Sequence, residues 1–261
     1  MNTFKYLVYD IESVINKPLL NKVLFPAENL SDEEAYQKHL QELLKEDRTF
    51  VNPSFHKPVC IAAVAVAEDF SISRVGLLGD VPRTVRSLVT AFWDVYAKQP
   101  CLVDFNGKGY DIRLMELWAF QLGLTIHKKH FVKFGARYRF NDEHHIDLHD
   151  FLTNHGAIRF MGGLNMFSKL LGKPGKINVK GDMVQELFEQ GELFRIEDYC
   201  LGDAMDTYFV FLRTRVMIGE ITLEREQELV LAAKEILERK QKEEGFFYDY
   251  LAHFGEWKPE E

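Results

Sequence analysis

The order of strands and helices along the chain constrains its fold more than any other feature of the sequence. Short apolar runs rich in β-branched and aromatic residues predict strands, all within the first 107 residues, over 4–10, 58–69, 72–79 and 101–107. Amphipathic or strongly apolar patterns predict helices over 31–47, 81–99, 110–124, 147–156, 163–172, 182–191, 196–219 and 222–245. Strands interleaved with helices predict an α/β protein built on a mixed sheet.

The bulk composition suits a globular protein with a sizeable core. The chain has 261 residues, 46% of them hydrophobic, and a formal net charge of -8. Its apolar runs, such as 59–67, are too short to span a bilayer, and the N-terminus lacks a secretory signal pattern, so we expect a cytoplasmic protein without a membrane partner. Cys60 and Cys101 lie in apolar, strand-like runs, so we expect them to be buried free thiols. The negative charge disfavours a non-specific nucleic-acid coat, but an enzyme that binds nucleic acid through metal cations stays open.

Two acidic residues, Asp10 and Glu12, follow the apolar part of the first predicted strand, 4–10. Side chains alternate between the faces of a strand, so these two carboxylates point to the same side. Like charges on one face repel each other, and a shared cation relieves that repulsion. The alternative is that the strand has ended and both acids are solvated.

Two further acidic positions occur at predicted helices. Asp111 follows the strand at 101–107 after a glycine-rich turn, where a ligand can approach the backbone closely, although an acid at a helix start is often only a cap. Tyr199 and Asp203 lie one turn apart on the apolar helix at 196–219. An acid near the buried face of such a helix needs a partner or a metal, unless that part of the helix faces solvent.

Three segments together resemble one enzyme family. "DIE" (10–12), "NGKGYD" (106–111) and "YCLGD" (199–203) are similar to the motifs of the DnaQ-like, or DEDD-type, 3′–5′ exonucleases. The tyrosine spacing matches the DEDDy branch, since the histidine branch needs His where this chain has Asp198. The wider sequence resembles stand-alone bacterial exonucleases related to the proofreading domain of family B DNA polymerases.

The resemblance implies an organisation for the whole chain. We expect an RNase H-like mixed sheet of about five strands flanked by helices, with an additional C-terminal helix. Residues 1–220 would form the exonuclease domain, with a helical insertion at about 20–56. Residues 221–261 would form a C-terminal helical extension packed on the same domain. The chain contains no polymerase domain.

The resemblance also implies the chemistry. The expected reaction is phosphodiester hydrolysis at a free 3′ end of single-stranded nucleic acid, DNA more than RNA, which releases nucleoside 5′-monophosphates with two Mg²⁺ or Mn²⁺ ions. Asp10, Glu12 and Asp203 would hold the ion that activates water, and Asp10 would bridge to the second ion, with Asp111 helping through water. Tyr199 would orient the water, because a phenol with an ordinary pKa of about 10 is a poor base at neutral pH.

Substrate contacts are predicted from a segment that alternates basic and aromatic residues, 127–140. This pattern suits phosphate contacts and base stacking on a single strand, with Lys128, Lys133 and Arg137 as the candidate phosphate contacts. The alternative is an exposed strand with charged residues that guard its edge. Near the acidic positions, Ile11, Phe105 and Asn106 are predicted to contact the terminal nucleotide, although Asn106 before Gly equally suits a turn.

Two rival functions are open. His145, Asp147 and His149 alternate and could bind Zn²⁺ or iron on a strand, and the pair His149 and Asp150 resembles the core of an HD-type phosphohydrolase. That class is all helical, which the predicted strands oppose, and we prefer Asp147 as the cap of a helix starting near Leu148. The second rival is a catalytically silent nucleic-acid-binding protein on the same fold, which the intact acids oppose.

Overall fold

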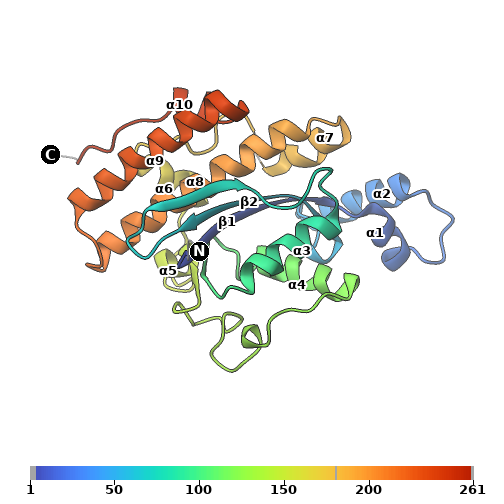
Figure 1. The fold of residues 1–261 in the computed structure, drawn as a ribbon. Helices are drawn as coiled ribbons and strands as arrows, with labels where there is room; N and C mark the ends of the chain where they lie inside the picture. The colour runs from blue at the N-terminus through green and yellow to red at the C-terminus, as the bar shows by residue number, and fades with distance from the viewer. Residues whose placement is uncertain (1–3, 180, 260–261) are drawn as a thin grey trace.

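The computed structural model describes residues 4–179 and 181–259. Its centre is a five-stranded sheet with the order β3-β2-β1-β4-β5. The bounds of the strands are Tyr6–Ile15 for β1, His56–Val66 for β2, Ile72–Leu77 for β3, Cys101–Asp104 for β4 and His145–Asp147 for β5. The pairs β1–β2 and β2–β3 are antiparallel, whereas β1–β4 and β4–β5 are parallel. This mixed sheet, flanked by helices, confirms the predicted RNase H-like α/β fold (Figure 1).

Strand β1 occupies the middle of the sheet and is longer than predicted. The prediction that it ends at the acidic pair is wrong, because β1 continues to Ile15. Pairing with β2 extends the strand past the acidic pair: Asp10 lies opposite Ala62, and Glu12 lies opposite Cys60. The register shifts only after Glu12. Both acids therefore belong to a strand that is paired along their length, and the alternative of a solvated strand end does not hold.

Helices cover both faces of the sheet (Figure 1). Helices α3 (Val85–Tyr96) and α4 (Asp111–Leu122) pack on one face, where Leu7, Tyr9 and Ile11 of β1 point into a shared core. The long helix α8 (Leu193–Met217) lies on the opposite face, where Tyr6 and Val8 of β1 join its core. The two-residue alternation predicted for β1 is thus observed.

Most predicted helices are present with shifted ends. Helix α3 begins at Val85, after the N-cap Thr84, so Pro82 precedes the helix instead of lying in its first turn. Helices not predicted as separate elements are α1 (Lys17–Leu24) and α10 (Tyr248–Ala252). The remaining elements are α2 (Asp32–Lys45), α5 (Leu148–Thr153), α6 (Gly163–Leu170), α7 (Val184–Glu189), α9 (Leu223–Glu244), and the 3-10 turns η1 (Pro53–Phe55), η2 (Lys128–His130) and η3 (Gly181–Met183).

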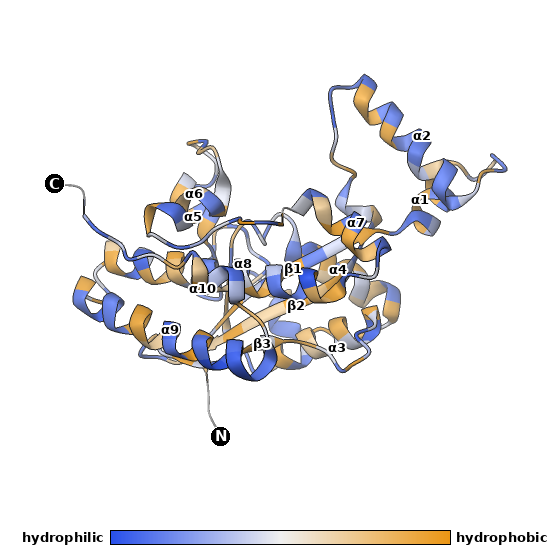
Figure 2. Ribbon diagram, turned by 90° about the horizontal axis from the view of Figure 1, so that it is seen from above, coloured by the Kyte–Doolittle hydropathy of each residue, from blue (hydrophilic) through white to orange (hydrophobic). Residues whose placement is uncertain are grey.

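Helices α1 and α2 form a hairpin between β1 and β2. The capping box expected at Ser31 and Glu34 is present at the start of α2. The hairpin projects from the body of the molecule in both ribbon views (Figure 1 and Figure 2). It has a small core of its own, made by Ile15, Leu20, Phe25, Ala35, Leu43 and Val51.

The C-terminal helices pack on α8. Leu229, Ala233 and Leu237 of α9 are buried in the same core as α8, together with Phe247 and with Tyr250 of α10. Cys60 is a buried free thiol as predicted, whereas Cys101, also predicted to be buried, is a half-buried free thiol; Cys200 is buried and free as well. None of the helices in residues 4–179 and 181–259 combines the length and apolar character that a membrane span requires.

Replacing Leu237 by alanine tests how much α9 contributes to the fold. Leu237 is 0% exposed, whereas Leu231, six positions earlier on the same helix, is 64% exposed. We expect Leu237→Ala to lower the free energy of unfolding by about 3 kcal/mol and Leu231→Ala by less than about 0.5 kcal/mol. Urea denaturation followed by circular dichroism measures both values. Equal losses would contradict the packing of α9 on α8.

Candidate active site

Three carboxylates from two elements meet on the α8 face of the sheet. Asp10 and Glu12 come from β1 and Asp203 comes from α8, and each offers an oxygen within 4.8 Å of the others. Asp10 and Glu12 share a face because they are two residues apart on one strand. Asp203 faces them because α8 packs along β1 and β2.

Burial raises the pKa of all three acids, and a neighbouring carboxylate adds to the shift for Asp10 and Glu12. Burial, followed by the nearby Asp203 charge, raises the pKa of Asp10 to about 8. Burial raises the pKa of Asp203 to about 6 and, with the Asp10 charge, raises the pKa of Glu12 well above its usual range. The cluster is therefore poorly neutralised by the protein itself, and a divalent cation would favour its charged form.

One oxygen atom of the cluster lacks a hydrogen-bond partner in the described part of the chain, a role that a cation could fill. Oδ2 of Asp10 is buried and has no hydrogen-bond partner among the described residues. A buried acceptor without a donor is costly, and coordination to a metal ion satisfies it. The cluster consists of carboxylate oxygens, which are the ligands that Mg²⁺ and Mn²⁺ prefer.

Asp111 lies next to this cluster but outside the group of three. It is the first residue of α4, whose N-cap is Tyr110, and so it is not the N-cap residue. Burial raises the pKa of Asp111 well above its usual range, and the charges of Asp10 and Asp104 raise it further. The repulsion from Asp10 shows that Asp111 belongs to the same electrostatic environment.

Tyr199 lies one helical turn before Asp203 on α8. Burial, followed by the charges of Asp203, Glu12 and Asp10, raises the pKa of Tyr199 far above its usual value. The phenol therefore keeps its proton at neutral pH and can act as a hydrogen-bond donor but not as a base. Asp206, further along α8, is engaged elsewhere and accepts a 2.6 Å hydrogen bond from the hydroxyl of Tyr250.

The predicted nucleotide contacts near the acids differ in accessibility. The side chain of Ile11 is 5% exposed and packs in the core beneath α3 and α4, so only its backbone can meet a nucleotide. Phe105 is half-buried and its ring contacts the rings of His149 and Phe167. Asn106 is exposed in the turn after β4 and adopts a left-handed conformation with φ of 70°.

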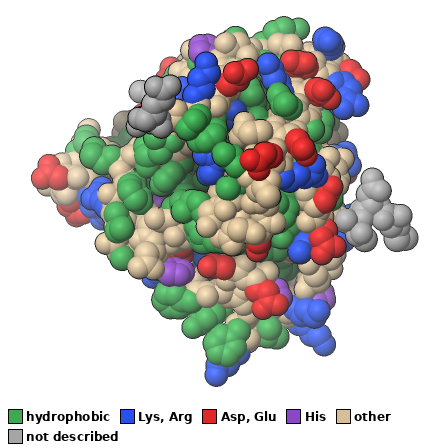
Figure 3. Space-filling model, turned by 90° about the vertical axis from the view of Figure 1, so that its left-hand side faces the viewer, with side chains coloured by type: hydrophobic (Ala, Val, Ile, Leu, Met, Phe, Trp, Pro, Cys, Tyr) green, Lys and Arg blue, Asp and Glu red, His purple; other side chains and the backbone are tan. Residues whose placement is uncertain are grey.

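The basic and aromatic segment, residues 127–140, packs against α3 and α4 and supplies no residue to the acidic group. It contains the 3-10 turn η2 and further turns but no strand, so the alternative of an exposed edge strand is wrong. Lys128, Lys133 and Arg137 are exposed, and so are the rings of Phe131, Phe134, Tyr138 and Phe140. Figure 3 shows hydrophobic side chains beside basic ones at the lower end of the molecule, where this segment lies.

Buried contacts anchor this segment to the domain. The ring of His130 is fully buried and lies 2.7 Å from a carboxylate oxygen of Glu116 and 3.2 Å from the hydroxyl of Tyr96. Arg137 also pairs with Glu116, at 3.3 Å. The segment is thus a fixed loop with exposed side chains, and Arg137 is already partly neutralised.

The histidine and aspartate residues of 145–150 do not form a separate metal site. Nε2 of His145 lies 2.6 Å from Asp104, in a buried contact. The prediction that Asp147 caps the following helix is confirmed, because its carboxylate accepts hydrogen bonds from the amides of His149 and Asp150. The HD-type alternative is wrong, because the five-stranded sheet is incompatible with an all-helical class.

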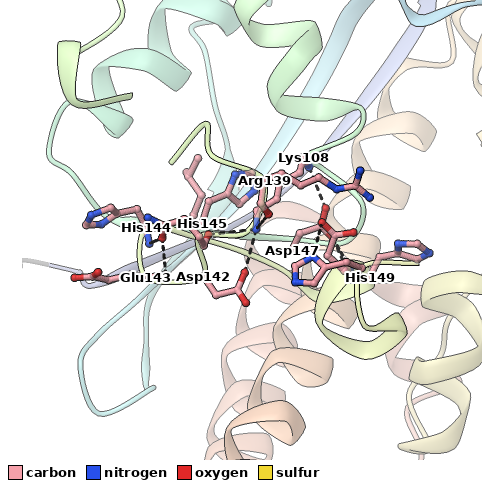
Figure 4. A network of polar contacts seen from close by, with 12 residues as sticks. Lys108, Arg139, Asp142, Glu143, His144, His145, Asp147 and His149 are labelled. Atoms are coloured by element: carbon pink, nitrogen blue, oxygen red, sulfur yellow. Dashed lines mark hydrogen bonds and ion pairs between the residues drawn. The ribbon is translucent and has the colours of Figure 1, made fainter. Parts of the chain in front are cut away.

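The structure also adds residues that sequence patterns did not connect with the site. Asp104, at the end of β4, and Asp147, at the end of β5, are buried acids beneath the turn that leads to Asp111. Figure 4 shows Asp147 within a network of polar contacts with Lys108 and residues 139–149. Asp104, two residues before the turn at 106–109, was the available signal, but its partner on β5 is 43 residues away in the sequence.

Comparison with known families identifies the class. A family model described as a predicted 3'-5' exonuclease related to the exonuclease domain of PolB matches residues 48–254, and the chain belongs to this family of hydrolytic nucleases. A search of curated proteins finds no match. The matched range contains Asp111, Tyr199 and Asp203. Asp10 and Glu12 precede it on β1, which pairs with the matched strands β2 and β4.

Proposed function

We propose that this 3′–5′ exonuclease degrades single-stranded nucleic acid, DNA in preference to RNA, and releases nucleoside 5′-monophosphates. The observation that carries the proposal is the group formed by Asp10, Glu12 and Asp203, with a buried carboxylate oxygen that lacks a donor. Burying three charged carboxylates together is costly without a cation. The chain that carries them belongs to an exonuclease family.

We assign the metal ligands as follows. Asp10, Glu12 and Asp203 would hold one Mg²⁺ or Mn²⁺ ion, and Asp10 would also hold a second, with the help of Asp111 through water. When bound, two such ions supply charge stabilisation for the attacking and leaving oxygens of a phosphodiester. The protonated phenol of Tyr199 would donate a hydrogen bond that orients the attacking water, as in the tyrosine branch of DEDD-type enzymes.

The same proposal includes the organisation of the chain. Residues 1–220 would form the catalytic unit, with the hairpin region at about 20–56 as an insertion, and residues 221–261 would be an extension on that unit. A cytoplasmic location suits the free thiols of Cys60, Cys101 and Cys200.

A ladder assay tests the function. Single-stranded DNA and RNA oligonucleotides labelled at the 5′ end would be incubated with the protein and either Mn²⁺ or EDTA. We expect products that shorten one nucleotide at a time with Mn²⁺, DNA faster than RNA, and no products with EDTA. Binding without cleavage would instead support the silent nucleic-acid-binding alternative.

The exposed cations of the 127–140 segment yield a separate prediction. A triple alanine variant at Lys128, Lys133 and Arg137 should raise KM for a long oligonucleotide about tenfold, with kcat nearly unchanged, because these residues contact phosphates far from the reacting bond. The salt dependence of binding should weaken by a slope of about 2 on a log–log plot, as expected when three phosphate contacts to a single strand are lost.

The control for this triple variant removes the same charges elsewhere. Lys98, Arg239 and Lys242 are also exposed and lie outside the segment. Their triple alanine variant should leave KM and the salt slope close to those of the unmodified protein. Equal effects of the two triple variants would show that net charge alone, rather than this segment, draws in the substrate.

A further inference from the structure

Two buried carboxylates accept hydrogen bonds from the backbone of the turn between β4 and α4. Oδ1 of Asp147 accepts a 2.7 Å hydrogen bond from the amide of Asn106, and its Oδ2 accepts one of 3.1 Å from the amide of Lys108. Between them, the amide of Gly107 donates to Oδ1 of Asp104 at 3.0 Å. Three consecutive backbone amides of the turn are therefore bound by two side chains.

The sheet brings these two carboxylates together. Asp104 and Asp147 are paired residues at the ends of the neighbouring parallel strands β4 and β5, and each is 1% exposed. The Asp104 charge adds to burial in raising the pKa of Asp147 to about 6. Two buried like charges are costly, and the donors around them offset that cost: the turn amides, the hydroxyl of Tyr9 at 2.6 Å and the ring of His145.

The turn has one backbone position where only glycine fits. A Cβ built on Gly107 would lie 2.0 Å from Oδ2 of Asp104. The backbone thus lies directly on the carboxylate, without space for a side chain. Asn106 beside it holds a left-handed conformation, which a hydrogen-bonded amide helps to maintain.

Lys108 connects the turn to residues 139–142, which include the end of the 127–140 segment. Its side chain is buried, and Nζ donates to the carbonyl oxygens of Arg139 and Asn141 and to Oδ1 of Asp142, at 3.0 to 3.2 Å (Figure 4). The buried ammonium group of Lys108 has three acceptors on one loop, so these hydrogen bonds fix the position of the side chain. The backbone of this residue is held by Asp147 and its side chain holds the loop.

We propose that Asp147, with Asp104, is a positioning residue that sets the place of Asp111 through the β4–α4 turn. Asp111 is the first helical residue after this turn, so a shift of the turn moves its carboxylate relative to Asp10. This inference rests on the proposed function, in which Asp111 serves the second metal ion. The ion held by Asp10, Glu12 and Asp203 depends on β1 and α8 and not on the turn.

Asp147→Ser separates this role from helix capping. Serine is also a good N-cap, so the start of α5 stays capped, but its short side chain cannot bind the amides of residues 106 and 108 at once. We expect the second Mn²⁺ ion to bind about tenfold more weakly, in the range found for residues that orient metal ligands, with the first ion unchanged. Titration of free Mn²⁺ by electron paramagnetic resonance measures both affinities.

Hydrogen exchange supplies a readout that needs neither metal nor substrate. In Asp147→Ser, the amides of residues 106–108 should exchange faster than in the unmodified protein, and residues 6–15 should be unchanged. Asp142→Ser is the matched control, because Asp142 touches only the outer end of Lys108; it should leave the second ion and the turn amides unaffected. Lys108→Met should loosen residues 139–142 while the turn amides stay protected.

The outcomes separate this inference from the proposed function. Unchanged exchange at residues 106–108 in Asp147→Ser would overturn the inference, and so would equal weakening of both ions, which indicates a general loss of fold. If the unmodified protein degrades no nucleic acid in the ladder assay, the proposed function fails, while the exchange and Mn²⁺ measurements still decide the role of Asp147. If only one ion binds the unmodified protein, the exchange measurement decides alone.

Discussion

Replacing Asp10 by alanine is expected to lower the rate of metal-dependent digestion about 1000-fold. Asp10 supplies an oxygen to the group with Glu12 and Asp203, and its second oxygen is buried without a donor. In the proposed mechanism it is the ligand that both ions share, so its loss removes about 4 kcal/mol of transition-state stabilisation. Single-turnover digestion of a 5′-labelled strand at saturating Mn²⁺ measures the rate.

A matched variant controls for the change of charge. Asp94 lies exposed on α3, on the opposite face of the sheet from Asp203, and Asp94→Ala should retain full activity. Thermal unfolding of both variants in EDTA should show that Asp10→Ala is folded. Full activity in Asp10→Ala would refute the assignment of the site.

Metal-free protein is expected to lose stability as the pH rises from 6 to 8. The pKa of Asp10 is raised to about 8 in the folded chain, against a usual 3.8, so in this range the folded state binds a proton that the unfolded state has released. The free energy of unfolding then falls with pH, by about 1.4 kcal/mol per unit for one such proton. Asp10 alone should contribute a loss of about 2 kcal/mol, or about 5 °C in Tm, in calorimetry with EDTA.

Divalent metal should reverse this trend, because a cation favours the deprotonated acids. Mn²⁺ is expected to raise Tm more at pH 8 than at pH 6, where protons compete with it for the same oxygens. Asp10→Asn should reduce this dependence by the contribution of Asp10, about 1.4 kcal/mol per pH unit, since an amide does not titrate. The rest of the dependence should remain, because burial still raises the pKa of Glu12 and of Asp111. A Tm independent of pH in EDTA, or an equal effect of Mn²⁺ at both pH values, would argue against the buried acidic cluster.

Local patterns were sufficient to predict much of this molecule. The alternation along β1 is a property of residues 4–12 alone, and it correctly placed Asp10 and Glu12 on one face. The apolar character of α8 likewise predicted a buried helix, and its one-turn spacing put Tyr199 beside Asp203. These features need no knowledge of distant neighbours.

Structural features that depend on contacts between residues far apart in the sequence were not predicted. Strand β1 extends to Ile15 because residues 56–61 of β2 pair with it, across the inserted hairpin. Strand β5 is three residues long, too short for a periodic signal, and its register with β4 creates the pair Asp104 and Asp147. The 127–140 segment is not a strand because His130 turns inward to Glu116, a contact that sequence alone does not reveal.

The chain order of the acidic group has a consequence for biosynthesis. Asp10 and Glu12 lie on β1 and are synthesised before Asp203 and Tyr199, which lie on α8. A nascent chain without α8 has two of the three clustered carboxylates and an uncovered sheet face, so it cannot assemble the site. The acidic group is therefore completed only after α8 has been synthesised and has packed on the sheet.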